Sequence, residues 1–353
     1  MSLSELIPAT IRTSGPISIA EYMALCLSHH EYGYYMKRDP FGAQGDFITA
    51  PEISQVFGEL LGLWLVAQWE KLGKPKATLA EFGPGRGTLM ADLLRGTKKI
   101  SGFHDAMNVR LLEISPSLKQ KQWNTLAGKH HDIEWLDSPD ALPEQPLFLI
   151  ANEFLDALPI RQFIHQDGRW QERMVGMEED KLIFTTSNDV PEAIQSTAAD
   201  KDGAIIETCE PAIEITTFIA EHIAKHGGAS LFIDYGYTQG SKGDSLQAMK
   251  QHHYHEILDN PGDADLTAHV DFAAIAETAK ASGAAVYGPT PQGKFLMKIG
   301  AGQRIQTLCA TATPEQGIDL VSGLERLASP DKMGDLFKVL AITSDNIKHA
   351  EGF

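Results

Sequence analysis

The stretch EFGPGRG at residues 81–87 constrains the fold of this chain more than any other segment. It places glycines at every second position, directly after the apolar run 77–82 and directly before a helical pattern that starts at Thr88. Glycine tolerates positive φ and carries no Cβ, so the backbone of such a turn can approach a ligand closely. A strand, a glycine turn and a helix in this order are typical of parallel α/β sheets, which bind ligands at the carboxyl ends of their strands.

The sequence after the turn also favours a parallel sheet. Strands are predicted at 77–82, 109–115, 133–138, 146–154 and 228–237, and helical patterns separate them. Such an alternation predicts helices on both faces of the sheet. We predict an N-terminal helical and lid region at 1–75 and an α/β domain at 76–353. The apolar helix 52–70 is expected in the core, although a homodimer face on it stays an alternative.

Two insertions interrupt this pattern, at about 161–205 and 238–270. Residues 161–187 alternate between apolar and polar side chains around Asp167-Gly168, a turn dipeptide, and therefore predict a β-hairpin or meander. Residues 238–270 are polar and rich in glycine and histidine, which predicts a long functional loop. Helix and strand are expected to return in the tail, at 271–283, 295–300 and 336–344.

Composition and charge argue against several functional classes. A formal net charge of −17 provides no general attraction to phosphate backbones, so we expect a cationic protein surface rather than nucleic acid as partner. Three scattered cysteines form neither a disulfide framework nor a metal-ligand spacing, and we expect no metal. No apolar run is long enough to span a bilayer, and no signal peptide is visible. The expected location is the cytoplasm of a bacterium or, in a eukaryote, the mitochondrial matrix.

The spacing of the glycines distinguishes between nucleotide ligands. Gly83, Gly85 and Gly87 follow the pattern GxGxG, whereas the dinucleotide fingerprint GxGxxG needs a glycine where Thr88 stands. No Gly-Lys-Ser/Thr of a phosphate-binding loop follows either. With Glu81 just before it, the turn is similar to that of S-adenosylmethionine-dependent methyltransferases. We expect Glu81 to face the ammonium group of that cofactor, directly or through water.

Acidic residues on the next two predicted strands fit the same cofactor. Glu113, near the end of the second strand and 26 residues after Gly87, can accept hydrogen bonds from both ribose hydroxyls. Asp137, at the end of the third strand, is placed to meet the adenine amino group, although a surface cap is the alternative. With Glu113 on the next strand, a turn that binds nothing is the weaker explanation of the glycines.

The fourth predicted strand ends in ANEFLDALP, where Asn152, Glu153 and Asp156 are expected to face the cofactor and the methyl group. Two carboxylates three residues apart suit a guanidinium, which pairs bidentately with carboxylates. They can align it and take the proton that it must lose on methylation. The alternative is that Glu153 and Asp156 cap a helix. His269 is a candidate base or substrate contact that can pair with Asp271, although Asp271 can also be an N-cap.

Several long strings are similar to those of the MidA-like family of class I methyltransferases, which occurs in bacteria and mitochondria. They are EYGYY, EFGPGRGTLMADLLR, ANEFLDALPIRQF, DYGY, DADLTAHVDF and MGDLFKVL. The resemblance implies a Rossmann-like, seven-stranded sheet with an N-terminal helical addition, and S-adenosylmethionine as cofactor. For the mitochondrial branch it implies arginine methylation of a respiratory complex I subunit during its assembly.

The turn GPGRG is also similar to the cofactor turn of symmetric arginine methyltransferases. That likeness implies that Glu153 and Asp156 correspond to a paired-glutamate loop and His269 to a histidine loop, although the two acids of those enzymes are more widely spaced. In the segment GDFITAP we expect Gly45, Asp46 and Thr49 to fold over the cofactor as a lid. An NAD-dependent oxidoreductase and an assembly factor that retains the fold without catalysis are the alternatives.

Overall fold

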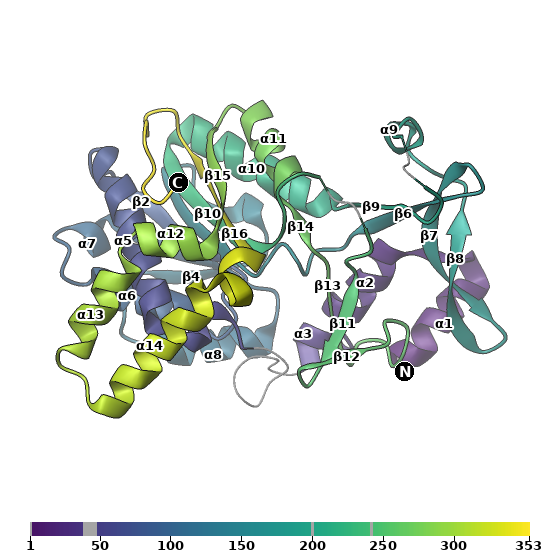
Figure 1. Ribbon diagram of the computed structural model, residues 1–353, viewed down its shortest axis with the longest axis horizontal. Helices are drawn as coiled ribbons and strands as arrows, with labels where there is room; N and C mark the ends of the chain where they lie inside the picture. Colours follow the sequence, from purple (N-terminus) through teal and green to yellow (C-terminus); the bar gives the residue numbers. More distant parts are fainter. Residues whose placement is uncertain (1, 38–47, 199–200, 241–242) are drawn as a thin grey trace.

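The computed structural model describes residues 2–37, 48–198, 201–240 and 243–353, and it has two lobes (Figure 1). The larger lobe contains a central sheet with strand order β15-β16-β10-β5-β2-β3-β4. The strands are β2 (Ala77–Phe82), β3 (Met107–Leu112), β4 (Ile133–Leu136), β5 (Leu147–Asn152), β10 (Gly228–Tyr237), β15 (Ala285–Pro291) and β16 (Phe337–Thr343). From β4 to β10 all neighbours are parallel, whereas β16 is antiparallel to β10 and β15. The predicted seven-stranded arrangement is confirmed, and the short strand β14 (Val270–Asp271), which pairs with β10, is an eighth strand of this sheet.

The parallel strands are apolar because both faces of the sheet are covered. β2 and β5 are buried at every position. Successive residues of β2 enter different cores, with Leu79 on one face and Ala80 on the other. Residues of α5 (Gln55–Lys71) and α6 (Thr88–Thr97) complete the first core, and those of α10 (Glu210–His226) and α11 (Phe272–Ala281) complete the second. The strands expected from the apolar runs are therefore confirmed, with ends that differ by up to three residues.

Helix α5 belongs to the core, as its sequence predicts. Twelve of its 17 residues are buried, and they lie on all sides of the helix. Gly62 allows α6 to approach closely, because a Cβ there would stand 2.9 Å from Cγ of Leu93. Among the large apolar residues of α5, Leu63 is the exposed one, at 39%. The helix therefore presents no broad apolar face to a second copy of the chain.

The smaller lobe joins the N-terminus to the first insertion. Its sheet has the order β1-β7-β6-β9, with β8 paired to β7. These strands are β1 (Ile17–Ser18), β6 (Arg161–Gln166), β7 (Arg169–Glu178), β8 (Lys181–Ser187) and β9 (Ile205–Thr208). The predicted hairpin is confirmed, because Asp167 and Gly168 form the two-residue loop between β6 and β7 and both have positive φ. Helices α1 (Leu3–Ser14) and α2 (Ile19–Ser28) share a core with this sheet.

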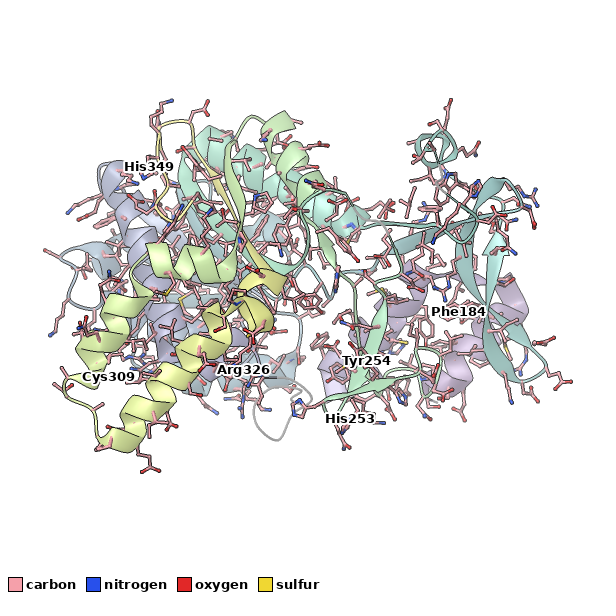
Figure 2. All side chains as sticks on the ribbon, in the orientation of Figure 1. Phe184, His253, Tyr254, Cys309, Arg326 and His349 are labelled. Atoms are coloured by element: carbon pink, nitrogen blue, oxygen red, sulfur yellow. The ribbon has the colours of Figure 1, made fainter. Side chains whose placement is uncertain are left out.

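The prediction of one long loop at 238–270 is wrong in part. Strands β11 (Gln247–Lys250), β12 (His253–His255) and β13 (Asp265–Thr267) form a small sheet, and β14 (Val270–Asp271) extends the edge of β10. These strands are too short for a pattern of alternation to be visible. His253 and Tyr254 begin strand β12, directly after the turn of the β11–β12 hairpin, and Tyr254 is 80% exposed (Figure 2).

The expected helix at 271–283 is α11, the stretch 295–300 lies mostly in helix α12, and the expected strand at 336–344 is β16. The other helices are α3 (Tyr34–Lys37), α4 (Ala50–Ile53), α7 (Phe103–Ala106), α8 (Pro116–Leu126), α9 (Glu192–Gln195), α12 (Gln292–Lys298), α13 (Ala301–Cys309) and α14 (Pro314–Ala328). None of the helices in the described ranges has the length and apolarity that crossing a membrane requires.

Candidate active site

The order of the strands places the site. From β2 the chain continues to β3 and β4 on one side, and then returns to β5 on the other side of β2. In open α/β sheets such a reversal leaves a crevice at the carboxyl ends of the two central strands, and ligands bind there. The glycine turn (residues 83–87) follows β2. The segment 153–156, which contains Glu153 and Asp156 and is called the acidic turn below, follows β5. A small cavity between them is lined by residues of both turns, including Glu81, Gly83 and Glu153.

The glycine turn needs glycine for two reasons. Gly83, Gly85 and Gly87 have φ of 65°, 53° and 80°, in the left-handed region that other residues rarely adopt. A Cβ on Gly83 would stand only 2.9 Å from the ring of Phe154. Gly87 is the N-cap residue of α6, so the free N–H groups of that helix begin at the turn. The turn thus brings bare backbone and a helix N-terminus to the crevice.

Glu81 lies at the bottom of this crevice. Its side chain is buried, and its Oε2 atom has no hydrogen-bond partner among the described residues. Burial raises the pKa of Glu81 to about 8, although a hydrogen bond from the backbone N–H of Met90 opposes that shift. A buried carboxyl with an unused oxygen fits a cationic ligand group, because such a group would compensate its charge.

Glu113 does not line this cavity, but Gln122, which no sequence pattern singles out, holds it beside the glycine turn. Oε1 of Glu113 accepts a hydrogen bond from the backbone N–H of Ser115 at 2.8 Å, and its Oε2 accepts one from Nε2 of Gln122 at 2.9 Å. The same Nε2 donates to the carbonyl of Gly85 at 2.8 Å, while Oε1 of Gln122 accepts from Trp135 at 2.7 Å. Gln122, which is fully buried, therefore ties Glu113 to the glycine turn. Burial raises the pKa of Glu113 against these hydrogen bonds.

Asp137 is placed differently from Glu113. Its side chain is 85% exposed, and its carboxylate pairs with Lys119 of α8 at 2.5 Å. It therefore does not line the small cavity between the two turns.

The acidic turn adopts a strained conformation. Glu153 has φ of +50°, in the left-handed region that is costly for a residue with a Cβ. Its Oε1 accepts hydrogen bonds from the backbone N–H of Ala50 at 3.1 Å and from Nδ2 of Asn152 at 3.2 Å. Burial raises the pKa of Glu153 to about 7, and the charge of Asp156 contributes to the rise. Oδ1 of Asn152 is buried and has no partner within the described residues.

Asp156 is anchored by two neighbours on β10. Its Oδ2 accepts a hydrogen bond from the hydroxyl of Tyr235 at 2.6 Å, and its Oδ1 is buried without a partner in the described part of the chain. Asp234 holds the turn itself, because its Oδ2 accepts from the backbone N–H groups of Leu155 at 3.1 Å and Asp156 at 3.2 Å. Burial raises the pKa values of both Asp156 and Asp234. The motif DYGY by itself does not indicate that Asp234 and Tyr235 support the acidic turn.

The alternative that Glu153 and Asp156 cap a helix is wrong, because the chain continues from this turn into strand β6. Glu153, Asp156 and Asp234 are also not arranged as a metal site. Across the described ranges no three His, Cys, Asp or Glu side chains are arranged to hold a metal ion.

His269 lies next to the acidic turn without contacting it directly. Its ring packs at 5.3 Å from that of Tyr235 and at 5.0 Å from that of Tyr237. Burial lowers the pKa of His269, and the charge of Lys338 adds to the effect. Asp271 is the N-cap of α11, since its Oδ1 accepts from two backbone N–H groups of that helix.

The expected lid is described only in part, because Gly45 and Asp46 lie outside the described residues. Thr49 lines the cavity between the two turns and is the N-cap residue of α4. The segment that follows it bridges both turns. The backbone of Ala50 contacts Glu153, while Glu52 accepts a hydrogen bond from Thr88 at 2.6 Å and lies 3.8 Å from Arg86.

Comparisons with known proteins agree with this geometry. A family described as "Putative S-adenosyl-L-methionine-dependent methyltransferase" matches residues 60–290. The mitochondrial protein arginine methyltransferase NDUFAF7 of Danio rerio is 36% identical, over 97% of this chain and 86% of its own length. The Drosophila melanogaster homologue is also 36% identical, over 97% and 84%. The fit to the cofactor rests on the structure itself, where Glu81 and Asn152 line the cavity beside the glycine turn and each has a buried oxygen without a hydrogen-bond partner among the described residues.

A solved structure supports the same assignment. A protein from Burkholderia thailandensis, crystallised with S-adenosyl-homocysteine, superposes with a TM-score of 0.86 at 28% identity. The superposition covers 99% of this chain and 95% of that one. With its strand order, its glycine turn and these relatives, the chain belongs to the S-adenosylmethionine-dependent methyltransferase family that the sequence motifs indicated.

Proposed function

We propose that this methyltransferase acts on an arginine side chain of a partner protein. The observation that carries the proposal is the acidic turn, where Oδ1 of Asp156 is buried without a partner among the described residues. A buried carboxylate is expensive unless a cation compensates it. A guanidinium is always protonated and presents several N–H donors in one plane, so it suits this turn better than a neutral acceptor would. The relatives named above are called protein arginine methyltransferases.

The two carboxylates each keep one oxygen for the substrate. Oε1 of Glu153 is committed to Ala50 and Asn152, and Oδ2 of Asp156 to Tyr235. Oδ1 of Asp156 has no hydrogen-bond partner of good geometry among the described residues, and the hydrogen bonds of the Glu153 carboxyl are to its Oε1 atom. Two oxygens from different side chains can hold two nitrogens of one guanidinium and direct the third toward the cofactor.

The raised pKa values suit the proton that the reaction releases. S-adenosylmethionine, when bound, supplies an electrophilic methyl group on its sulfonium. The arginine nitrogen forms the new N–C bond as the S–C bond breaks, and it must lose one proton. Glu153, with a pKa of about 7, can accept this proton and return it to water near neutral pH. Glu81, Asn152 and Glu113 would hold the cofactor at its ammonium and ribose groups, and Thr49 would close over it.

The finer assignments rest on the family resemblance. It implies a subunit of respiratory complex I as the substrate, and we place the reaction in the bacterial cytoplasm or the mitochondrial matrix. The relatives are themselves named as mitochondrial proteins. We propose no homodimer interface. An assembly factor without catalysis is the alternative, but the intact acidic turn argues against it.

The test combines cofactor binding with methyl transfer. Titration calorimetry should give micromolar binding of S-adenosylmethionine and none of NAD, and Glu113→Ala should abolish it. The purified protein is incubated with radiolabelled cofactor and an extract from cells that lack it. Hydrolysis of the extract proteins should then yield labelled methylarginine. Glu153→Gln should keep cofactor binding and lose transfer at least a hundredfold, while Glu315→Gln on exposed α14 should change neither. Binding without label in arginine, or a Glu153→Gln variant with normal transfer, would overturn the proposal.

A further inference from the structure

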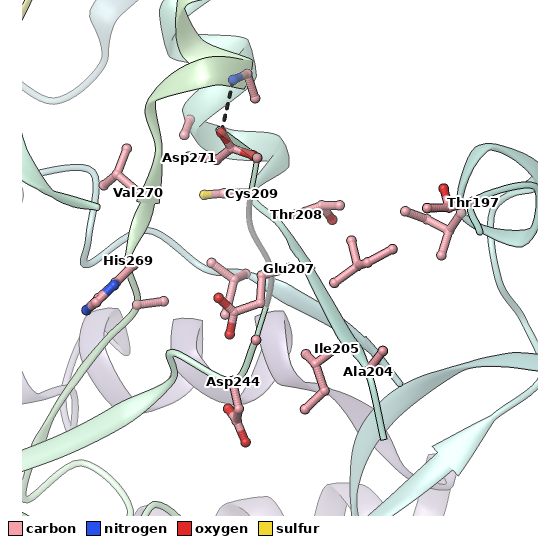
Figure 3. A pocket seen from close by; sticks show the side chains of 18 of the residues that line it. Thr197, Ala204, Ile205, Glu207, Thr208, Cys209, Asp244, His269, Val270 and Asp271 are labelled. Carbon is pink, nitrogen blue, oxygen red and sulfur yellow. Dashed lines mark hydrogen bonds between the residues drawn. The ribbon is translucent and has the colours of Figure 1, made fainter. Parts of the chain in front are cut away.

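A second cavity, of about 770 Å³, lies between the two lobes beside the acidic turn (Figure 3). Its wall comes from β9, the start of α10, α11, the segment 268–271 and the stretch between β5 and β6. The volume is typical of ligand sites in proteins. It shares no lining residue with the crevice between the glycine turn and the acidic turn, so it is a separate space.

The wall of this cavity selects an apolar occupant. Six of the apolar side chains that line it are Leu155, Ile160, Ile206, Ile213, Val270 and Ile275. Its three carboxylates, Glu207, Asp244 and Asp271, already have hydrogen-bond or ion-pair partners. Glu207 accepts a hydrogen bond from Gln162 at 2.7 Å, and Asp244 pairs with Arg173 at 2.7 Å. Lys201 and His269 also line the cavity, but most of its wall is apolar, so a polyhydroxylated ligand would find few polar partners here.

The cavity adjoins the acidic turn. Leu155, which lines the cavity, directly precedes Asp156 in the turn. Ala268 also lines it, and its backbone N–H donates to the carbonyl of Asp156 at 3.0 Å. An extended polypeptide advances about 3.3 Å per residue. When one side chain of a substrate polypeptide lies at Asp156, its residues two to four positions away would therefore reach the cavity.

Strand β9 has an edge along which an extended substrate peptide can lie. It is the last strand of its sheet, and residues 203–209 all line the cavity. At this edge the backbone N–H of Gly243 donates to the carbonyl of Ile205, and Ser245 hydrogen-bonds the side chain of Glu207, so part of the edge is already occupied. Edge strands commonly bind extended peptides, with pockets for alternate side chains. The occupant that fits best is therefore an extended polypeptide with apolar side chains.

Resting on the proposed arginine methylation, we propose that this cavity recognises the apolar residues that flank the target arginine in the substrate protein. The arginine enters the acidic turn, and apolar side chains two to four residues away fill the cavity. Burying one leucine-sized side chain should improve substrate binding by about tenfold.

The test uses synthetic peptide pools with a central arginine, in which one neighbouring position at a time is fixed as leucine or as serine. Transfer of labelled methyl groups and binding of the S-adenosyl-homocysteine-loaded protein to the immobilised pools are both measured. The wild-type protein should prefer leucine about tenfold at one or more positions on one side of the arginine. Ile213→Asp and the cavity-filling Ala274→Trp should abolish that preference with unchanged cofactor affinity. Ile318→Asp, at a 69% exposed position on α14, is the matched control and should keep it.

The outcomes separate the two proposals. Methylation of all pools to the same extent, or a preference that survives in both cavity variants, would overturn this inference and leave arginine methylation standing. Absence of label from every pool would count against arginine methylation. In that case binding decides: a leucine preference that Ile213→Asp removes supports the docking site, and uniform binding refutes it.

Discussion

Replacing Gln122 with leucine tests how the cofactor crevice is held together. Leucine fills a similar volume, so the change removes hydrogen bonds rather than packing. Three groups lose their partner: the carbonyl of Gly85, Oε2 of Glu113 and Nε1 of Trp135. Each buried polar group left unpaired costs about 1–3 kcal/mol, and Trp135 is only half-buried. We expect the free energy of unfolding to fall by about 3–6 kcal/mol.

The cofactor should report the same loss at the site. Glu113 and the glycine turn lose their common link, so the Kd for S-adenosylmethionine should rise at least tenfold in calorimetry. Urea unfolding followed by tryptophan fluorescence gives the stability. Gln120→Leu, the same substitution on the exposed face of α8, should change stability by less than about 0.5 kcal/mol. A Gln122→Leu variant with wild-type stability and a Kd within twofold of wild type would refute the reasoning.

Three further predictions follow from the site. The pKa of Glu81 is raised above its unfolded value, so the folded state loses stability as pH rises from about 4.5 through 8. In calorimetric scans Glu81→Gln should therefore raise the melting temperature at pH 9 but not at pH 5. An equal gain at both pH values would contradict this prediction. Gly83→Ala should abolish cofactor binding and lower the free energy of unfolding more than Gly102→Ala does. Gly102 also has positive φ, but a Cβ there would meet open space. Equal losses of unfolding free energy in chemical denaturation would argue against the steric reason. Tyr235→Phe removes a hydrogen bond that lowers the pKa of Asp156, so the acidic limb of the pH profile of kcat/KM should move to higher pH. An acidic limb that does not move would exclude Tyr235 as the group that tunes Asp156.

Much of the large lobe could be predicted because its signals are local. A strand buried on both faces is an uninterrupted apolar run, and β2, β5 and β10 are visible as such. The hairpin at Asp167-Gly168 is equally local, because two successive residues with positive φ need these residue types. The small strands at 247–267 were missed, since three or four residues carry too little periodicity.

The supporting residues of the site could not be predicted in the same way. Gln122 lies in the middle of α8, where glutamine is an ordinary surface residue, and Asp234 lies in a strand that reads as core. Their roles depend on contacts with Gly85 and Leu155, which are 37 and 79 residues away in the chain. The packing of α1 and α2 on the insertion sheet, rather than on the central one, is equally non-local.

The sequence by itself determined the sheet, the class of cofactor and the acids at the ends of β2 and β5, because alternation, glycine spacing and strand ends are properties of neighbouring residues. Only the tertiary structure decided that Asp137 pairs with Lys119 at the surface, that Asp234 and Tyr235 hold Asp156, and that an apolar cavity opens beside the turn. These features arise where segments distant in the chain meet, and burial and hydrogen bonding there depend on partners that no local pattern specifies.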